Sequence, residues 1–289
     1  MKQIKEKLSF NPHFVSLCVM LGTALPSFTK FKGNTVLSFL IAFSVFAFFS
    51  FFLYLIVWAV IKKAPPMMAV TFWVLIAVYS LFVFKSAFTA FLSFAEQTVF
   101  KNKILLILLL VILFLSLLKL KNEGFLKLSL ILFSVSLLIL FTFFILLSKS
   151  CDFSRITSLY ARDDSIAEST LTFLKETFLP MLILIPYQAL TFKQLRIKAY
   201  FTGSLVSTVI LFLMVAFPVF LFGAEFTSRL DFPFSTAVST ISVGRLYSRL
   251  DGFYYFFVFS GTLIKGMTAL FTAGMSLCNI KKLYEQNSE

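Results

Sequence analysis

The sequence contains few charged residues for its length. Of its 289 residues, 13% are Asp, Glu, Lys or Arg, whereas 59% are hydrophobic and 41 are phenylalanine. Soluble domains carry about 25% charged residues. A chain of this composition would leave a large apolar surface exposed to water, so the composition excludes a soluble globular protein. It predicts an all-α polytopic membrane protein.

Residues that build catalytic and metal centres are scarce as well. There are three cysteines and one histidine. Cys18 and Cys278 fall in apolar runs, Cys151 stands alone in a polar segment, and His13 has no carboxylate or cysteine cluster near it. We therefore expect no disulfide, no metal site, no cofactor and no enzymatic activity.

The net charge of +13 predicts a membrane partner rather than a nucleic acid. The basic residues lie mainly between the apolar runs, where they would contact anionic lipid headgroups. No basic motif with interleaved aromatic residues indicates base stacking. The bilayer is therefore the expected partner of these charges.

Eight apolar segments are long enough to cross a bilayer. A spanning helix needs about 20 mostly apolar residues. The fourth segment is short and depends on lysines at its ends. We expect spans at 12–29, 35–61, 67–92, 102–119, 127–148, 171–190, 199–223 and 250–278.

The basic residues also favour a cytoplasmic location for both termini. An excess of Lys and Arg marks the cytoplasmic side of a membrane protein. With the N-terminus inside, the compact clusters Lys62-Lys63, Lys193 to Lys198 and Lys281-Lys282 all fall on the inner side. The first apolar segment ends without a small-residue cleavage pattern, so we expect an anchor helix there rather than a signal peptide.

Two predicted spans contain helix-breaking residues. The first carries Gly22 and Pro26, and the sixth carries Pro180 and Pro186 close to Glu176. Proline removes a backbone donor and clashes with the preceding turn. A simple proline kink is one interpretation. Breaks in spans one and six also fit a transporter built from two five-helix inverted repeats, whose broken helices present backbone groups to a substrate.

On the second interpretation the chain has one membrane domain in three parts. Residues 1–148 form a first five-helix repeat, 149–170 form a polar outer loop, and 171–289 form an incomplete second repeat with helices six to eight. A short helix is expected within 224–250, begun by Asp231 and Pro233 and ended by Gly244. Its apolar face would contain Phe234, Val238 and Ile241.

Two lysines lie inside predicted spans. A cation at mid-membrane costs roughly 2.5–3.5 kcal/mol on insertion scales, so it usually faces a bundle interior or a wet cavity. Snorkelling to an interface or a structural ion pair are the alternatives. Lys85 lies in the third span and Lys265 in the eighth, with Glu176 as the expected partner of Lys265.

The surroundings of Lys265 predict a helix with one polar and one apolar side. Gly261, Thr262 and Thr268 share its stripe, whereas the opposite side carries Phe256, Phe259, Leu263 and Leu270 and is expected to face lipid. The candidate ligand-binding residues are Gly22, Thr23, Ala24, Pro26, Lys85, Glu176, Thr177, Thr262 and Lys265.

One stretch of the sequence resembles a known family. It contains Phe232-Pro233-Phe234, Ile241-Ser242-Val243-Gly244, Arg249-Leu250-Asp251 and then Lys265 within an apolar helix. This order of motifs is similar to that of the endospore germination permeases, the B subunits of nutrient germinant receptors in the amino acid–polyamine–organocation superfamily. The sixth span, which ends in LPMLILIPY, also resembles the family.

The resemblance implies a fold and a function. The fold would be an inverted-repeat amino acid transporter fold with broken helices one and six, here without the last two of the usual ten helices. Spans one, three, six and eight would line the site. The function would be to bind a small polar nutrient such as an amino acid, in the inner spore membrane or the bacterial cytoplasmic membrane, together with A-type and C-type (lipoprotein) receptor subunits. A secondary amino acid permease driven by an ion or proton gradient is the alternative.

Overall fold

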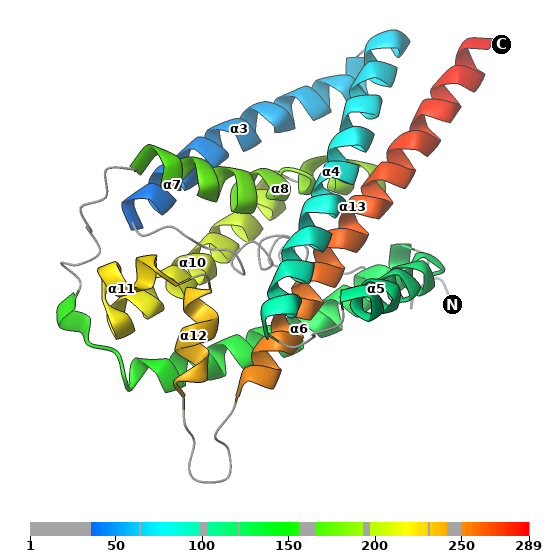
Figure 1. Ribbon diagram of the computed structural model, residues 1–289. Helices are drawn as coiled ribbons and strands as arrows, with labels where there is room; N and C mark the ends of the chain where they lie inside the picture. The colour runs from blue at the N-terminus through cyan, green and yellow to red at the C-terminus, as the bar shows by residue number, and fades with distance from the viewer. Residues whose placement is uncertain are drawn as a thin grey trace, which may run out of the picture.

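The computed structural model describes residues 36–63, 65–98, 103–120, 122–155, 166–192, 197–230, 232–241 and 250–288, and the regular structure in these ranges is helical (Figure 1). The predicted first span at 12–29 lies outside the described residues. The described helices are arranged as a bundle (Figure 1). The all-α class predicted from composition is therefore confirmed for these ranges.

Five helices are long and apolar enough to cross a membrane. They are α3 (Val36–Lys63), α4 (Pro66–Thr98), α6 (Asn122–Ser148), α10 (Ile197–Phe222) and α13 (Asp251–Ser288). The helix α5 (Lys103–Leu118) is apolar but shorter, as expected for the fourth span. The chain is thus a multi-pass membrane protein by the length and composition of its helices.

The predicted sixth span is interrupted and is not one helix. It consists of α7 (Ile166–Phe173), the π-helix η3 (Leu174–Phe178), α8 (Leu179–Met181) and α9 (Leu184–Phe192). Its first helix begins at Ile166, inside the segment 149–170 that the sequence assigned to an outer loop. The break surrounds Pro180, as the sequence predicted, because proline cannot continue the hydrogen-bond pattern of an α-helix, whereas Pro186 lies within α9.

The helix α13 lies at the centre of the bundle. In its most apolar window 78% of the residues are buried inside the protein, compared with 22% for α3. It runs side by side with α4, its most extensive neighbour, along most of its length (Figure 1). Every residue from 260 to 269 is buried, so the expectation that Leu263 faces lipid is wrong. The reason is that protein surrounds this part of α13 on all sides.

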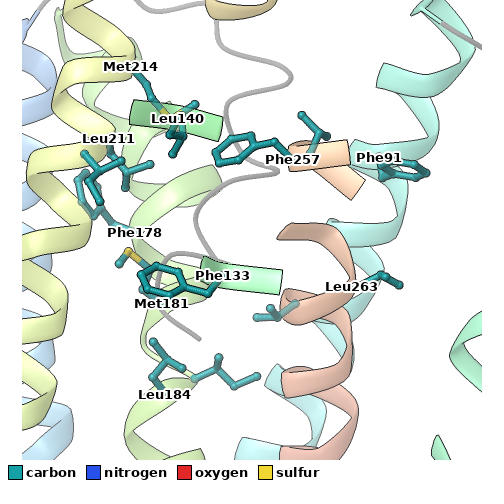
Figure 2. Close-up of a cluster of buried hydrophobic side chains, with 14 of the residues drawn as sticks. Phe91, Phe133, Leu140, Phe178, Met181, Leu184, Leu211, Met214, Phe257 and Leu263 are labelled. Atoms are coloured by element: carbon teal, nitrogen blue, oxygen red, sulfur yellow. The ribbon is translucent and has the colours of Figure 1, made fainter. Parts of the chain in front are cut away.

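Large apolar side chains fill the space between these helices. Figure 2 shows Phe178 and Met181 from the broken helix near Leu211 and Met214 of α10, with Phe257 and Leu263 of α13 on the other side. Interlocked aromatic and aliphatic side chains of this kind supply dispersion contacts, which drive helix packing where lipid removes the hydrophobic effect.

Two short helices close one end of the bundle. The first is α11 (Ala224–Ser228), which the sequence did not predict, and the second is α12 (Pro233–Ser239). Pro233 opens α12 as expected, and Phe234 and Val238 are buried against the bundle. The expected end at Gly244 lies outside the described residues.

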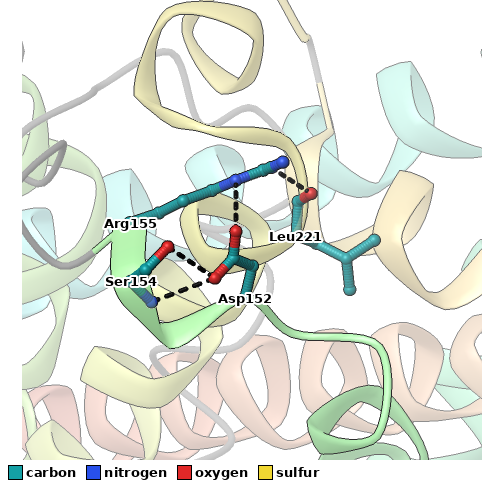
Figure 3. A network of polar contacts seen from close by, with 4 residues as sticks. All are labelled: Asp152, Ser154, Arg155 and Leu221. Atoms are coloured by element: carbon teal, nitrogen blue, oxygen red, sulfur yellow. Dashed lines mark hydrogen bonds and ion pairs between the residues drawn. The ribbon is translucent and has the colours of Figure 1, made fainter.

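A polar turn after α6 ties that helix to α10 (Figure 3). The Asp152 carboxylate accepts hydrogen bonds from the Ser154 backbone N–H at 3.0 Å and from the Ser154 hydroxyl at 2.6 Å, and it pairs with Arg155 Nε at 3.4 Å. Arg155 Nη1 donates to the carbonyl of Leu221 at 2.6 Å, near the end of α10. The bonds from Ser154 and the Arg155 guanidinium lower the pKa of the Asp152 carboxyl.

Candidate functional site

The break in the sixth span leaves backbone groups that a continuous helix would use. The backbone N–H of Leu179 reaches back to the carbonyl of Leu174, which is the wide π-helical turn directly before Pro180. After Pro180 the N–H groups of Leu182 and Ile183 bond the carbonyls only three residues earlier, at 3.0 and 3.3 Å. Wide and tight turns in succession are typical of functional breaks in membrane helices.

A tyrosine from α4 satisfies one of the displaced carbonyls. The hydroxyl of Tyr79 donates to the carbonyl oxygen of Leu179, the first residue of α8. This oxygen also accepts the N–H of Leu182 at 3.0 Å, and Tyr79 supplies a second donor in place of the N–H of Ile183, which bonds Pro180. Because the membrane interior has no water to replace such a bond, Tyr79 stabilises the broken geometry.

Aromatic contacts hold the first half of the break against α3. The ring of Phe178 is fully buried and lies 5.3 Å from that of Phe39 and 5.2 Å from that of Phe46. Aromatic pairs at such separations each contribute about 0.5–1.5 kcal/mol beyond area burial. The π-helix is therefore anchored on α3, and α9, which follows the break, contacts both α3 and α13.

The second half of the break packs against α13. Every residue from 180 to 189 is buried, and α9 contacts α13 directly. Near the end of α9 the Thr191 hydroxyl lies 4.0 Å from the sulfur of Met275. The broken helix and α13 are thus the two elements whose middle stretches are enclosed on all sides.

The enclosed part of α13 is unusually polar. Lys265 is 1% exposed, and the hydroxyl residues around it on the helix are fully buried. Most of these hydroxyls donate to a carbonyl of the same helix: Thr262 to Val258 at 2.9 Å, Thr268 to Ile264 at 2.7 Å and Thr272 to Thr268 at 2.7 Å. Each hydroxyl oxygen keeps accepting capacity. The stretch therefore offers a cation and a row of acceptors inside an apolar bundle.

Gln188 on α9 adds an unsatisfied acceptor next to this stretch. Its side chain is 5% exposed, and its Oε1 atom accepts no hydrogen bond from the described residues. Gln188 precedes Thr191 by three residues, so both lie on the side of α9 that contacts α13. A buried polar atom without a partner costs about 1–3 kcal/mol, so a water or a bound group that donates to Gln188 Oε1 would be stabilising.

The structure places the predicted ligand-binding residues in three groups. Thr262 and Lys265 lie in the enclosed stretch of α13. Thr177 is buried in η3, and Glu176 is its neighbour there, but the Glu176 side chain is outside the described part, so its pairing with Lys265 stays a prediction. The four residues of the first span, Gly22, Thr23, Ala24 and Pro26, lie outside the described residues.

Lys85 does not belong to this site. Its side chain is exposed, although α4 itself packs along α13. The inward face of α4 carries Ile76, Val83 and Ala87, and Lys85 falls on the opposite side of the helix. The expectation that it lines a central site is corrected on that ground.

Sequence reasoning missed Tyr79 and Gln188. A signal for Gln188 was present, because a glutamine two residues after a proline inside an apolar span is unusual. Tyr79 had no such signal, since tyrosine is common in membrane helices. Comparisons with known proteins do not help to assign the site: no family model, curated protein or solved structure matches the chain.

Proposed function

We propose that the chain is a non-enzymatic membrane subunit that binds a small polar nutrient of the amino acid class. The observation that carries this proposal is the packing of a broken helix against a buried stretch of α13, with the Lys265 ammonium on one element and the orphaned Gln188 oxygen on the other. An amino acid carries a carboxylate for the first group and an ammonium for the second. The carboxylate of the ligand would thus bind Lys265 on α13, and its ammonium would bind Gln188 on α9.

The resemblance to germination permeases supports a receptor role for this binding. The chain would act as the B-type subunit of a nutrient germinant receptor, in the inner spore membrane or the cytoplasmic membrane, with A-type and C-type subunits as partners. A ligand that bridges α9 and α13 would bind one conformation of the broken helix more tightly than another. This difference in affinity shifts the population toward the first conformation, which is how binding produces a signal. A secondary permease driven by an ion or proton gradient is the second candidate, which the same broken helix supports.

Binding to purified protein tests the proposal. Radiolabelled amino acids should bind the detergent-solubilised chain, and Lys265→Met should abolish binding. Lys85→Met is the matched control, because it makes the same substitution at an exposed position in another span and should leave binding intact. A Lys265→Met protein that folds and binds normally would overturn the site.

Gln188→Leu separates a ligand role from a packing role. If Oε1 accepts a hydrogen bond from the ligand, Gln188→Leu should bind the amino acid more weakly. The unliganded variant should be more stable than the parent, because it lacks an unsatisfied buried atom that costs about 1–3 kcal/mol. Thermal unfolding with and without amino acid measures both effects. Unchanged affinity with raised stability would show that Gln188 serves packing alone.

A double substitution tests the predicted pair of Lys265 with Glu176. If the two side chains form an ion pair, Glu176→Gln combined with Lys265→Met should cost less stability than the sum of the single changes. Additive losses would argue against the pair.

Two further measurements distinguish receptor from permease. Uptake of labelled amino acid into proteoliposomes that contain only this chain would favour the permease. Spores that lack the gene should lose germination in response to amino acids if the chain is a receptor subunit, and they should respond normally to non-nutrient triggers.

A further inference from the structure

One lysine on the outer surface of the bundle has no role in the site described above. Lys85 is exposed on α4 and is the only charged residue between Lys63 and Glu96. Its exposed neighbours one and two turns away are apolar: Val78, Leu81 and Phe82. These residues and Lys85 lie on one side of the helix, and we call this side the Lys85 face.

The ammonium of Lys85 forms no ion pair with any of the described residues. The Thr89 hydroxyl on its own face donates to the Lys85 carbonyl at 3.0 Å and, because it is neutral, offers the ammonium no counter-charge. A lone cation on a lipid-facing surface is unfavourable, so it normally acquires a partner or reaches an interface.

Snorkelling is hindered by the direction of the side chain. Glu96, the first charged residue after Lys85, lies 11 positions further along the helix, or about 16 Å at 1.5 Å per residue. Side chains of an α-helix point toward its N-terminus, and for Lys85 that direction leads deeper into the apolar part of α4. The shorter path from Lys85 to water leads toward Glu96, which is opposite to the direction in which the Lys85 side chain points.

The chain itself has no suitable carboxylate for this face. The predicted first span, 12–29, contains neither Asp nor Glu. Two carboxylates fall within the predicted spans: Asp251, in the first turn of the eighth span rather than at mid-membrane, and Glu176, which lies in η3, an element that packs against α3. A second copy of the chain is therefore a poor source of counter-charge.

We infer that the Lys85 face docks a transmembrane helix of a different protein, and that this helix carries an Asp or Glu within its apolar run. The apolar residues pack against the partner helix, and the ammonium pairs with its carboxylate. Helix association in membranes depends on this combination of close packing and interhelical polar bonds. The inference does not depend on the nutrient site.

Photo-crosslinking in the cells that naturally make the chain tests the inference. A benzoyl-phenylalanine residue at position 82 lies beside Lys85, and one at position 141 is the matched control, because Phe82 and Phe141 are both 57% exposed and lie on different helices. Position 82 should capture a single membrane protein that position 141 does not. Mass spectrometry then identifies its span and any carboxylate in it.

Substitutions at Lys85 decide between the possible occupants. Lys85→Met should reduce the yield from position 82 by about three- to tenfold, and Lys85→Arg should retain it. Lys85→Glu combined with a Lys in place of the partner's acid should restore it. Because Lys85 is exposed, these variants should melt like the parent, and Lys85→Gln replaces Lys85→Met if the latter does not accumulate.

Three results would overturn the inference. They are an adduct with twice the mass of the chain, adducts with lipid alone, and a partner whose captured span carries no carboxylate. Nutrient binding by the purified chain is unaffected by any of these results, so failure here leaves the proposed function standing.

Discussion

Replacing Gly266 with alanine should destabilise the bundle, even though alanine normally favours a helix. A methyl group at Gly266 would lie 2.7 Å from two carbons of the Phe114 ring on α5 and 3.5 Å from Phe84 on α4. Phe114 is 5% exposed and its ring lies edge-to-face against that of Phe84 at 5.3 Å, so it has little room to move. Overpacking of this kind typically costs about 1–3 kcal/mol.

The same helix supplies the control. A methyl group at Gly274 would meet nothing within 4 Å, so Gly274→Ala should gain the roughly 1 kcal/mol by which alanine exceeds glycine in a helix. That gain is common to both substitutions and cancels in the comparison. The difference between the two variants is therefore the packing cost alone, about 2–12 °C in melting temperature at 2–4 °C per kcal/mol.

Thermal unfolding in detergent, followed by size-exclusion chromatography of heated samples, measures this difference. Gly266→Ala combined with Phe114→Leu should recover part of the loss, because the smaller side chain makes room for the methyl group. The packing of α5 on α13 described above would be contradicted by either of two results. The first is that Gly266→Ala has the same melting temperature as Gly274→Ala, and the second is that the losses from Gly266→Ala and Phe114→Leu simply add in the double variant.

Two other contacts give simpler predictions. Tyr79→Phe should destabilise the protein by about 0.5–1.5 kcal/mol in the same melting assay, since it removes one of the two hydrogen bonds to the Leu179 carbonyl and leaves only the N–H of Leu182; a neutral effect would contradict a stabilising role for Tyr79. The lowered pKa of Asp152 means that its contribution to the turn is complete above its unfolded pKa of about 3.9 and disappears as the pH falls through the folded value. Hydrogen exchange at Ser154, corrected for intrinsic rates, should therefore accelerate on acidification below about pH 4, and Asp152→Asn should remove this pH dependence; a pH-independent parent would contradict the assignment.

The sequence was sufficient for the elements that length and proline determine. An apolar run of about 20 residues has one stable conformation in a bilayer, so the spans from the second to the eighth could be located. The break near Pro180 could be placed for a similar reason, because proline cannot donate to the preceding turn wherever it lies. The helical start at Pro233 follows from the same residue chemistry.

The sequence could not predict whether a given apolar or charged side chain contacts lipid or another helix. Lipid and protein interior are both apolar, so Leu263 fits either surroundings and its pattern could not reveal that α13 is enclosed. Lys85 and Lys265 look alike as single cations in apolar runs, yet one is exposed and the other buried. The orphaned oxygen of Gln188 depends on the positions of atoms from another helix, which no local pattern encodes.

The central position of α13 has a consequence for how the protein is made. This helix follows all the other described helices in the chain, yet α4, α5, α6, α9 and α12 all pack against it. During synthesis, α4 and α6 enter the membrane before their main packing partner, α13, exists. The hydrogen bond of 2.8 Å between the hydroxyls of Ser136 on α6 and Ser260 on α13 can form only after α13 is inserted. Contacts between segments so distant in sequence form late. Until α13 is inserted, the outer helices remain an incomplete assembly that cellular quality control can recognise and degrade.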